Sequence, residues 1–306
     1  WGVNWPIMKS AVGAYPAMAF RAWSMVLGLP CLWVGLKLLR VPLQVPRRYW
    51  GELLLLATTN MVAWHLCLMW ALPGLSSGRA AIIGYTMPVF SALWGMLLYR
   101  QRLSRPQWVG VGSATAGVVL LLWHEFSRLS GVPLAGLTLL AGTAVWALGT
   151  QQLRRSAMDV PVLAIGFWMT AITTVAVLLY VGSTDGLPAN QPSPRVWAAI
   201  AYNALLIFGF CHVAWFALAR ALPPVAASVS ISLIPVLGLL SGALWLNEAL
   251  HWQDGAAVLL IMLAIGVETG GYQRVEHLIV VRCLRMGLEQ QDGAAPQALP
   301  KIDVLF

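Results

Sequence analysis

The chain contains a nearly continuous series of apolar stretches, each about as long as one membrane-crossing helix. About 20 residues span a bilayer core as a helix, which pairs every backbone N–H and C=O without water. Only 10% of the 306 residues are charged and 59% are hydrophobic, whereas soluble domains carry about 25% charged residues. Polar joints separate ten stretches: 1–14, 16–39, 50–72, 79–99, 107–123, 133–153, 161–182, 196–219, 225–246 and 254–272. The sequence therefore predicts an all-α integral membrane protein with ten transmembrane helices. A transmembrane β-barrel is excluded because its alternating segments of ~10 residues are absent.

The basic residues predict how these helices cross the membrane. Cytoplasmic loops of membrane proteins retain Lys and Arg. With the N-terminus inside, fourteen of the nineteen Lys and Arg residues fall in the inner loops and the C-terminal segment, four fall outside, and Arg21 lies within a helix. We therefore expect both termini in the cytoplasm, with 273–306 as a cytoplasmic tail. Because topology accounts for the net charge of +8, we expect the lipid bilayer as a partner and no nucleic acid.

The sequence contains no pattern typical of a catalytic, metal or cofactor site. The four cysteines, at 31, 67, 211 and 283, lack metal-site spacing, so we expect neither zinc nor a disulfide. His124-Glu125 lacks the second histidine of a zinc-protease helix, and the chain has no phosphate-binding loop or nucleophile elbow. We expect a protein that is not an enzyme and that needs no cofactor.

Similar residues recur at a nearly constant spacing along the chain, which indicates an internal duplication. The pairs 145 residues apart are Trp1 with Trp146, Lys9 with Arg154 and Pro16 with Pro161, and those 147 apart include His65 with His212, Pro88 with Pro235 and Leu103 with Leu250. The repeats are expected over 1–123 and 133–272. Since each contains five helices, an odd number, the second repeat enters the membrane from the opposite side. The first range is short and begins at Trp1, so we expect its helix to start upstream.

Several motifs resemble those of the drug/metabolite transporter superfamily, EamA type. They are Trp1-Gly2-x-Asn4 with Lys9, Pro16-x-x-x-Phe20-Arg21, Pro88 in the fourth range, and Asn247-Glu248-x-Leu250 before a glycine-bearing helix. The resemblance extends to about residue 272. It implies export of small metabolites, including amino acids, through a central cavity lined mainly by helices 1, 3, 4, 6, 8 and 9. Gln101 stands where the first repeat of the family usually has Glu.

Two histidines are the first candidates for contact with a solute. His65 and His212 lie midway along the third and eighth ranges at equivalent repeat positions. Polar groups inside a membrane are costly and therefore need a partner or a function. Histidine near its ordinary pKa accepts a proton or binds a carboxylate. The alternative is a neutral histidine bonded to a backbone carbonyl between packed helices.

Aromatic and amide side chains complete the candidate substrate site. By position, the resemblance implies that Trp64 or His65, Tyr85 and Trp146 line the cavity. Asn4, Trp5 and Gln151 are added because the tryptophans of the first and sixth ranges share faces with these amides. The alternatives are interface anchoring for the tryptophans and helix–helix hydrogen bonding for the amides.

Four further residues carry separate expectations. Pro88 and Pro235 interrupt helical hydrogen bonding and are predicted hinges. Arg21 is expected either to extend toward the membrane surface or to pair with a helix terminus, and Glu268 to do the same, although a buried Glu268 would be a candidate for proton coupling.

These observations favour an inner-membrane secondary transporter that exports a small organic solute, including aromatic amino acids, by alternating access between two inverted repeats. One alternative is a membrane subunit that transports nothing, consistent with the irregular tail. Another is a membrane-embedded enzyme acting on lipid, which would require clustered acidic or histidine residues at one interface. The sequence leaves the oligomeric state open.

Overall fold

The computed structural model is a helical bundle, and it describes residues 1–100, 102–127, 133–184, 186, 188, 190–211, 214, 224–264 and 266. No strand occurs within these ranges. The helices are α1 (Asn4–Val12), α2 (Ala17–Leu38), η1 (Arg47–Tyr49), α3 (Trp50–Ala57), η2 (Thr58–Val62), α4 (Ala63–Ala71), η3 (Leu72–Gly74), α5 (Ser77–Gly84), α6 (Met87–Tyr99), α7 (Arg105–Ser127), α8 (Pro133–Arg155), α9 (Val162–Ser183), α10 (Pro194–Tyr202), η4 (Asn203–Cys211) and α12 (Pro224–Leu246). A further apolar helix spans Trp252–Ala264.

Six helical stretches within the described ranges are long and apolar enough to cross a membrane. They are Ala17–Leu38, Arg47–Gly74, Ser77–Tyr99, Leu134–Arg155, Val162–Ser183 and Pro194–Cys211, and shorter apolar helices cover Trp108–Leu120, Leu233–Leu246 and Trp252–Ala264. Their outer surfaces carry large apolar side chains such as Leu38, Leu244 and Trp252, which are 72 to 79% exposed. Side chains of this kind are unfavourable in water and suit a lipid environment. The all-helical membrane architecture is confirmed, whereas the count of ten crossings and the position of the termini stay predictions.

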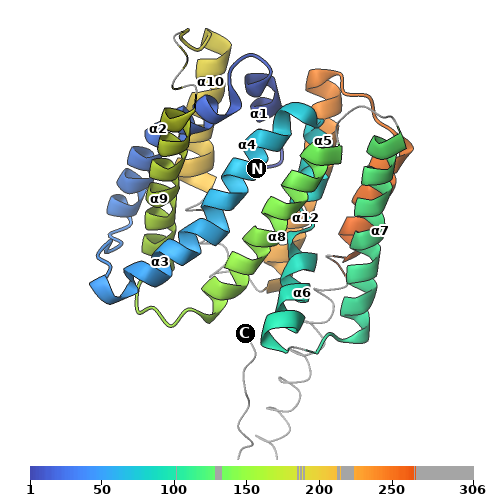
Figure 1. Ribbon diagram of the computed structural model, residues 1–306, viewed down its shortest axis with the longest axis horizontal. Helices are drawn as coiled ribbons and strands as arrows, with labels where there is room; N and C mark the ends of the chain where they lie inside the picture. The colour runs from blue at the N-terminus through green and yellow to red at the C-terminus, as the bar shows by residue number, and fades with distance from the viewer. Residues whose placement is uncertain are drawn as a thin grey trace, which may run out of the picture.

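The bundle has three parts in Figure 1. Helices α2, α9 and α10 form one side, and α6 and α7 form the other. Between them run α8 and the long stretch formed by α3, η2 and α4, which pack tightly against each other. Glycine permits this close approach: a Cβ added to Gly142 would lie 2.6 Å from the Cβ of Cys67, and one added to Gly149 would lie 2.7 Å from the backbone nitrogen of Asn60. The central position of α8 brings the two predicted repeats into direct contact.

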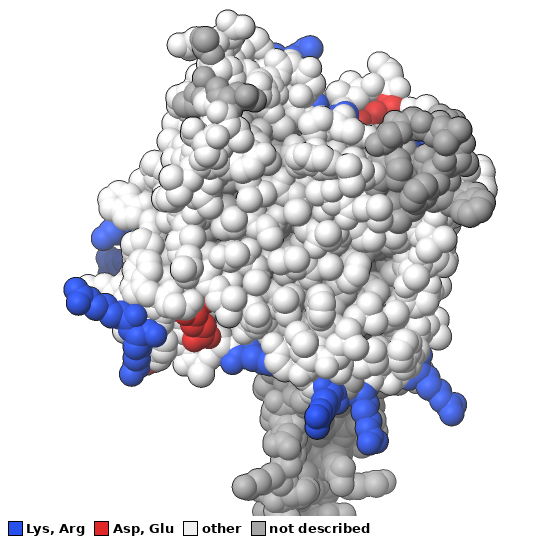
Figure 2. Space-filling view, in the orientation of Figure 1, with Lys and Arg blue, Asp and Glu red and all other residues white. Residues whose placement is uncertain are grey.

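Basic residues lie at the two ends of the bundle and leave an uncharged band between them in Figure 2. We call one end the arginine-rich end; its basic residues are Lys37, Arg40, Arg47, Arg48, Arg100, Arg102, Arg105, Arg154 and Arg155. At the opposite end the described basic residues are Lys9, Arg79 and Arg195.

Backbone features recur at the spacing that the sequence suggested. Pro16 and Pro161, 145 apart, precede α2 and α9 with nearly the same dihedral angles, φ −55° and ψ 128° or 132°. Arg100 and Asn247, 147 apart, follow α6 and α12 in the left-handed conformation, with φ 54° and 52°. Helix ends at equivalent positions therefore have equivalent geometry.

The stretches Arg47–Gly74 and Pro194–Cys211, which lie in the third and eighth predicted ranges, each contain a π-helix that the sequence did not predict. The π-helix η2 interrupts the α-helix over Thr58–Val62, and η4 covers Asn203–Cys211. Subtracting 147 places η4 at 56–64, over η2. The hydroxyls of Thr58 and Thr59 donate to the carbonyls of Leu54 and Leu55 at 2.8 and 2.9 Å. These bonds give the two carbonyls hydrogen-bond donors where the backbone pattern changes. π-Turns occur often at functional sites.

Candidate functional site

Three of the predicted tryptophans meet at one point in the bundle. The rings of Trp64 on α4 and Trp146 on α8 are 5.0 Å apart between centroids. Trp5 on α1 approaches the same place, because a Cβ added to Gly84 would lie 3.1 Å from the ring of Trp64 and 3.2 Å from that of Trp5. Only a residue without a side chain leaves both rings in place. We call Trp5, Trp64 and Trp146 the aromatic cluster.

The fourth crossing segment is broken beside this cluster. The sequence predicted a continuous helix over 79–99, but α5 ends at Gly84 and α6 begins at Met87, with Tyr85 and Thr86 in a turn between them. Pro88 cannot donate to the carbonyl of Gly84, which explains the break. Thr86 is buried and its hydroxyl donates to the carbonyl of Ile83 at 2.7 Å. Tyr85, half-buried, packs against the core that contains Trp5.

A second group of side chains surrounds the ring of Phe208 in η4. His65 is 7% exposed, and its ring lies 6.0 Å from that of Phe208. Two residues of α2 approach Phe208. The Arg21 guanidinium lies 5.7 Å from the centroid of its ring, and Gly28 packs against its side chain. Arg21 Nη2 is 3.0 Å from the sulfur of Met8 on α1. We call His65, Arg21, Phe208 and Met8 the Phe208 cluster.

Arg21 corrects one sequence-based expectation. It does not extend toward the membrane surface, since only 2% of it is exposed. Helix packing buries its side chain between α1, α2 and η4, and its Nε lacks a hydrogen-bond partner. Arg21 lies near the start of α2, which suggested exposure, but its burial depends on the neighbouring helices, which the sequence does not identify.

The predicted amides have different surroundings. Asn4 is 6% exposed and its Oδ1 lacks a hydrogen-bond partner. Gln151 donates to the carbonyl and hydroxyl of Ser91 at 2.8 and 2.9 Å, and its Oε1 accepts from Arg155. The bonds of Gln151 hold α8 to α6, which is the helix–helix role considered as its alternative.

The remaining predicted residues divide between the two halves of the chain. Pro88 lies directly after the helix break, whereas its repeat partner Pro235 is buried inside the continuous helix α12. His212 and Glu268 lie outside the described residues. Their roles, and the hinge roles of the two prolines, stay predictions.

An ion and hydrogen-bond network joins distant segments at the end opposite the arginine-rich end. Glu248 Oε1 accepts from the Ser77 backbone N–H at 2.8 Å, and its Oε2 accepts from the Ser77 hydroxyl at 2.8 Å and the Gly78 N–H at 3.4 Å. A carboxylate there also complements the N-terminal dipole of α5. Arg79 Nε pairs with Asp254 at 3.0 Å. Sequence reasoning noted Glu248 only as a family motif, because its partners are 170 and 171 residues away.

Lys9 extends this network to the first helix. Its ammonium donates to the carbonyls of Leu72 and Pro73 at 3.1 and 2.7 Å, at the end of η3. We call this end, with Lys9, Ser77, Arg79, Glu248 and Asp254, the clamped end. Its contacts link helices of the first half to Glu248, in the loop after α12, and to Asp254, in the first turn of the helix Trp252–Ala264.

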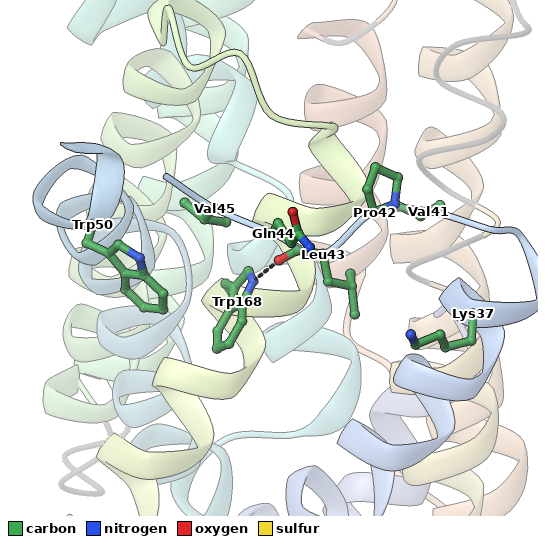
Figure 3. A pocket seen from close by; sticks show the side chains of 8 residues that line it. All are labelled: Lys37, Val41, Pro42, Leu43, Gln44, Val45, Trp50 and Trp168. Atoms are coloured by element: carbon green, nitrogen blue, oxygen red, sulfur yellow. Dashed lines mark hydrogen bonds between the residues drawn. The ribbon is translucent and has the colours of Figure 1, made fainter. Parts of the chain in front are cut away.

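A pocket of about 550 Å³ lies at the arginine-rich end. Figure 3 shows it between loop 41–45, Lys37 and the indoles of Trp50 and Trp168, with the Trp168 indole donating to the carbonyl of Leu43 at 2.7 Å. None of the predicted substrate-binding residues within the described ranges lines this pocket. It therefore differs from the site that the sequence indicated.

The described residues include no group of three or more His, Cys, Asp or Glu side chains placed to hold a metal ion. The chemistry that the two clusters offer is aromatic contact together with one cation and one imidazole in a buried setting, and the amide of Asn4 on α1 is buried as well.

Comparison with known proteins identifies relatives over most of the chain. The EamA-like transporter family matches residues 1–123 and 133–267. The uncharacterized transporter YoaV of Bacillus subtilis (strain 168) is 20% identical over 275 residues, which cover 90% of this chain and 94% of YoaV. The uncharacterized inner membrane transporter YedA of Escherichia coli (strain K12) is 27% identical over 195 residues, or 64% of this chain and 62% of YedA.

Two further comparisons concern function and fold. A Salmonella typhimurium (strain LT2) protein named a probable amino-acid metabolite efflux pump is 23% identical over 209 residues, covering 65% of this chain and 70% of its own length. A solved crystal structure superposes with a TM-score of 0.62 at 19% identity, over 86% of this chain and 92% of that one. At this identity the similarity concerns the fold alone.

Proposed function

Because the chain belongs to the EamA-like transporter family and is a multi-pass inner-membrane transporter, we propose that it exports small organic metabolites through a site between its two halves. The single observation that carries this proposal is the aromatic cluster beside the broken fourth segment. Discontinuous membrane helices are a recurrent feature of secondary-transporter binding sites. The Cα of Gly84, at the end of α5, faces the rings of Trp5 and Trp64, and Pro88 has no N–H to donate to the Gly84 carbonyl.

The proposed architecture is ten transmembrane helices in two inverted repeats of five. Support comes from the matched backbone geometry at Pro16 and Pro161 and at Arg100 and Asn247, and from the overlap of the two π-helices under the same spacing. The concentration of arginines at one end supports cytoplasmic placement of that end and of both termini. The clamped end then faces outward.

Alternating access requires one end to open while the other closes. At the clamped end, Glu248 and Asp254 from the second half hold Ser77, Gly78 and Arg79 of the first half. We propose that this network is the outer gate, and that Pro88 at the helix break provides a hinge on which α5, carrying the gate residues and Gly84, moves relative to α6. A substrate entering from the cytoplasm would be released outward once these bonds separate.

The proposed solutes are amino acids and related metabolites, including aromatic ones. Flat rings suit the aromatic cluster, since offset-stacked and edge-to-face ring pairs are favourable. The name of the Salmonella relative, a probable amino-acid metabolite efflux pump, also supports amino-acid-related solutes. In keeping with relatives named as transporters, we further propose that the chain has no enzymatic activity.

Counterflow in proteoliposomes tests this function. The purified chain is reconstituted with labelled amino acids and amines, and exchange is compared with empty liposomes. We expect exchange of at least one aromatic solute, and a marked loss in Trp64→Ala but not in Trp70→Ala, which alters an exposed tryptophan on the same helix. No exchange across the panel would remove the amino-acid proposal and favour a subunit that transports nothing.

A further inference from the structure

One charge in the bundle is buried without a counter-ion. Arg21 is 2% exposed, and no Asp or Glu among the described residues contacts it. The carboxylates of Glu248 and Asp254 already have partners at the clamped end, and Glu52 lies in the first turn of α3. A buried charge is costly unless it is paired and hydrogen-bonded. A structural arginine would be expected to have a carboxylate or carbonyl partner.

The contacts that Arg21 does make are weak. The sulfur of Met8, 3.0 Å from Nη2, is a poor acceptor, and the Phe208 ring attracts the guanidinium only through its π-face at 5.7 Å. Nε has no hydrogen-bond partner. Guanidinium nitrogens are arranged for two parallel bonds to a carboxylate, and here that capacity is unused.

Arg21 is also placed where a solute of the proposed transporter would pass. Its guanidinium lies between α1 and α2 of the first half and η4 of the second half. His65, the predicted site histidine, lies 6.0 Å from the same Phe208 ring that Arg21 approaches to 5.7 Å. Asn4 lies one helical turn from Met8 on α1, so the two side chains share a face, and its buried Oδ1 lacks a donor.

From these contacts we propose that Arg21 binds the carboxylate of the transported solute. The inference rests on the proposed function and names the chemical class that the site selects. One guanidinium neutralises one negative charge, and the nearest other cation on α1, Lys9, is engaged with the carbonyls of Leu72 and Pro73. A monocarboxylate therefore fits better than a dianion such as phosphate. Asn4 Oδ1 accepts a hydrogen bond from a donor group on the same solute, and the aromatic and Phe208 clusters contact its apolar part.

Thermal unfolding of the full chain in detergent tests this inference without requiring transport. Wild type is measured alone and with benzoate, L-phenylalanine, phenethylamine or inorganic phosphate. We expect both carboxylates to raise Tm, and phenethylamine and phosphate to leave it unchanged. Arg21→Met should remove the carboxylate effect, Arg21→Lys should retain part of it, and the exposed control Arg195→Met should behave as wild type.

The solute-free variants distinguish a binding residue from a structural one. Because Arg21→Met replaces an unpaired charge by an apolar side chain, we expect its Tm without solute to equal or exceed that of wild type. A lower Tm would identify Arg21 as structural and overturn the proposal. Equal stabilisation by phenethylamine and L-phenylalanine, or no stabilisation by either carboxylate, would also overturn it.

Counterflow in the same preparations separates this proposal from the proposed function. Arg21→Met should reduce carboxylate exchange roughly 10- to 100-fold, the loss expected for a charged hydrogen-bonding group. Carboxylate-selective stabilisation without exchange by wild type would refute transport of these solutes but leave Arg21 as an anion site. Unchanged exchange by Arg21→Met would refute the role of Arg21 and leave transport in place.

Discussion

Substituting Glu248 by glutamine removes one charge from the clamped end with almost no change in shape. Glu248 accepts bonds of 2.8 Å from the Ser77 N–H and the Ser77 hydroxyl, and a longer one from Gly78. Glutamine keeps one oxygen acceptor, so it retains at most part of this set. The network also loses the favourable interaction of a carboxylate with the start of α5.

The magnitude follows from these contacts. A hydrogen bond to a charged group contributes about 1.5–3 kcal/mol and one between neutral groups about 0.5–1.5 kcal/mol. Converting three charged bonds to two neutral ones would cost more than this in a dry interior, but Glu248 is only half-buried and solvent screens its charge, so we expect the closed arrangement to lose roughly 2 kcal/mol. Since 1.4 kcal/mol is a tenfold change in an equilibrium constant, the ratio of molecules with this end open to molecules with it closed should rise about 30-fold.

Double electron–electron resonance measures this population directly. Spin labels at cysteines introduced for Pro73 and Leu250, both exposed, report the separation of the two loops in nanodiscs after the native cysteines are replaced. We expect Glu248→Gln to add or enlarge a longer-distance component. Glu52→Gln, the same change at the arginine-rich end, should leave the distribution as in wild type. An unchanged distribution in Glu248→Gln would refute the argument that this network holds the end closed.

Three further outcomes are expected from single substitutions. His65→Ala should lower counterflow by about tenfold without reducing expression, because a buried polar contact of this kind is lost; equal rates would refute its place in the site. Gly149→Ala should lower Tm, because the added Cβ would lie 2.7 Å from the backbone nitrogen of Asn60, whereas Gly182→Ala has open space and should not; equal Tm values would contradict the tight packing. Trp168→Phe should cost about 1 kcal/mol of stability by removing the indole donor of the pocket in Figure 3, measured by chemical unfolding, and no loss would exclude a stabilising bond there.

The segments that local sequence determines were predicted well. Apolar length and the prolines at 16 and 161 predicted the starts of α2 and α9 within a residue. The position of Pro88 also indicated a disturbed fourth helix, although the predicted span ran on through the two-residue break at Tyr85 and Thr86. These features depend on residues close together in the chain.

Features that depend on distant contacts were missed. The burial of Arg21 requires η4, nearly two hundred residues further along the chain, and the clamp joins Ser77 to Glu248 across 171 residues. The π-helices change the backbone hydrogen-bonding pattern by one residue, and hydropathy reports the polarity of side chains rather than this pattern, so it cannot reveal them. To predict that Glu248 pairs with the start of α5, one would have to know which helices are neighbours in the fold.

Uptake of labelled L-phenylalanine and benzoate into inside-out membrane vesicles tests the central claim most directly, because export from a cell corresponds to uptake into such vesicles. We predict uptake by vesicles containing the wild-type chain that exceeds uptake by vesicles containing equal amounts of Trp64→Ala. Equal uptake by the two would contradict export through the site beside Gly84.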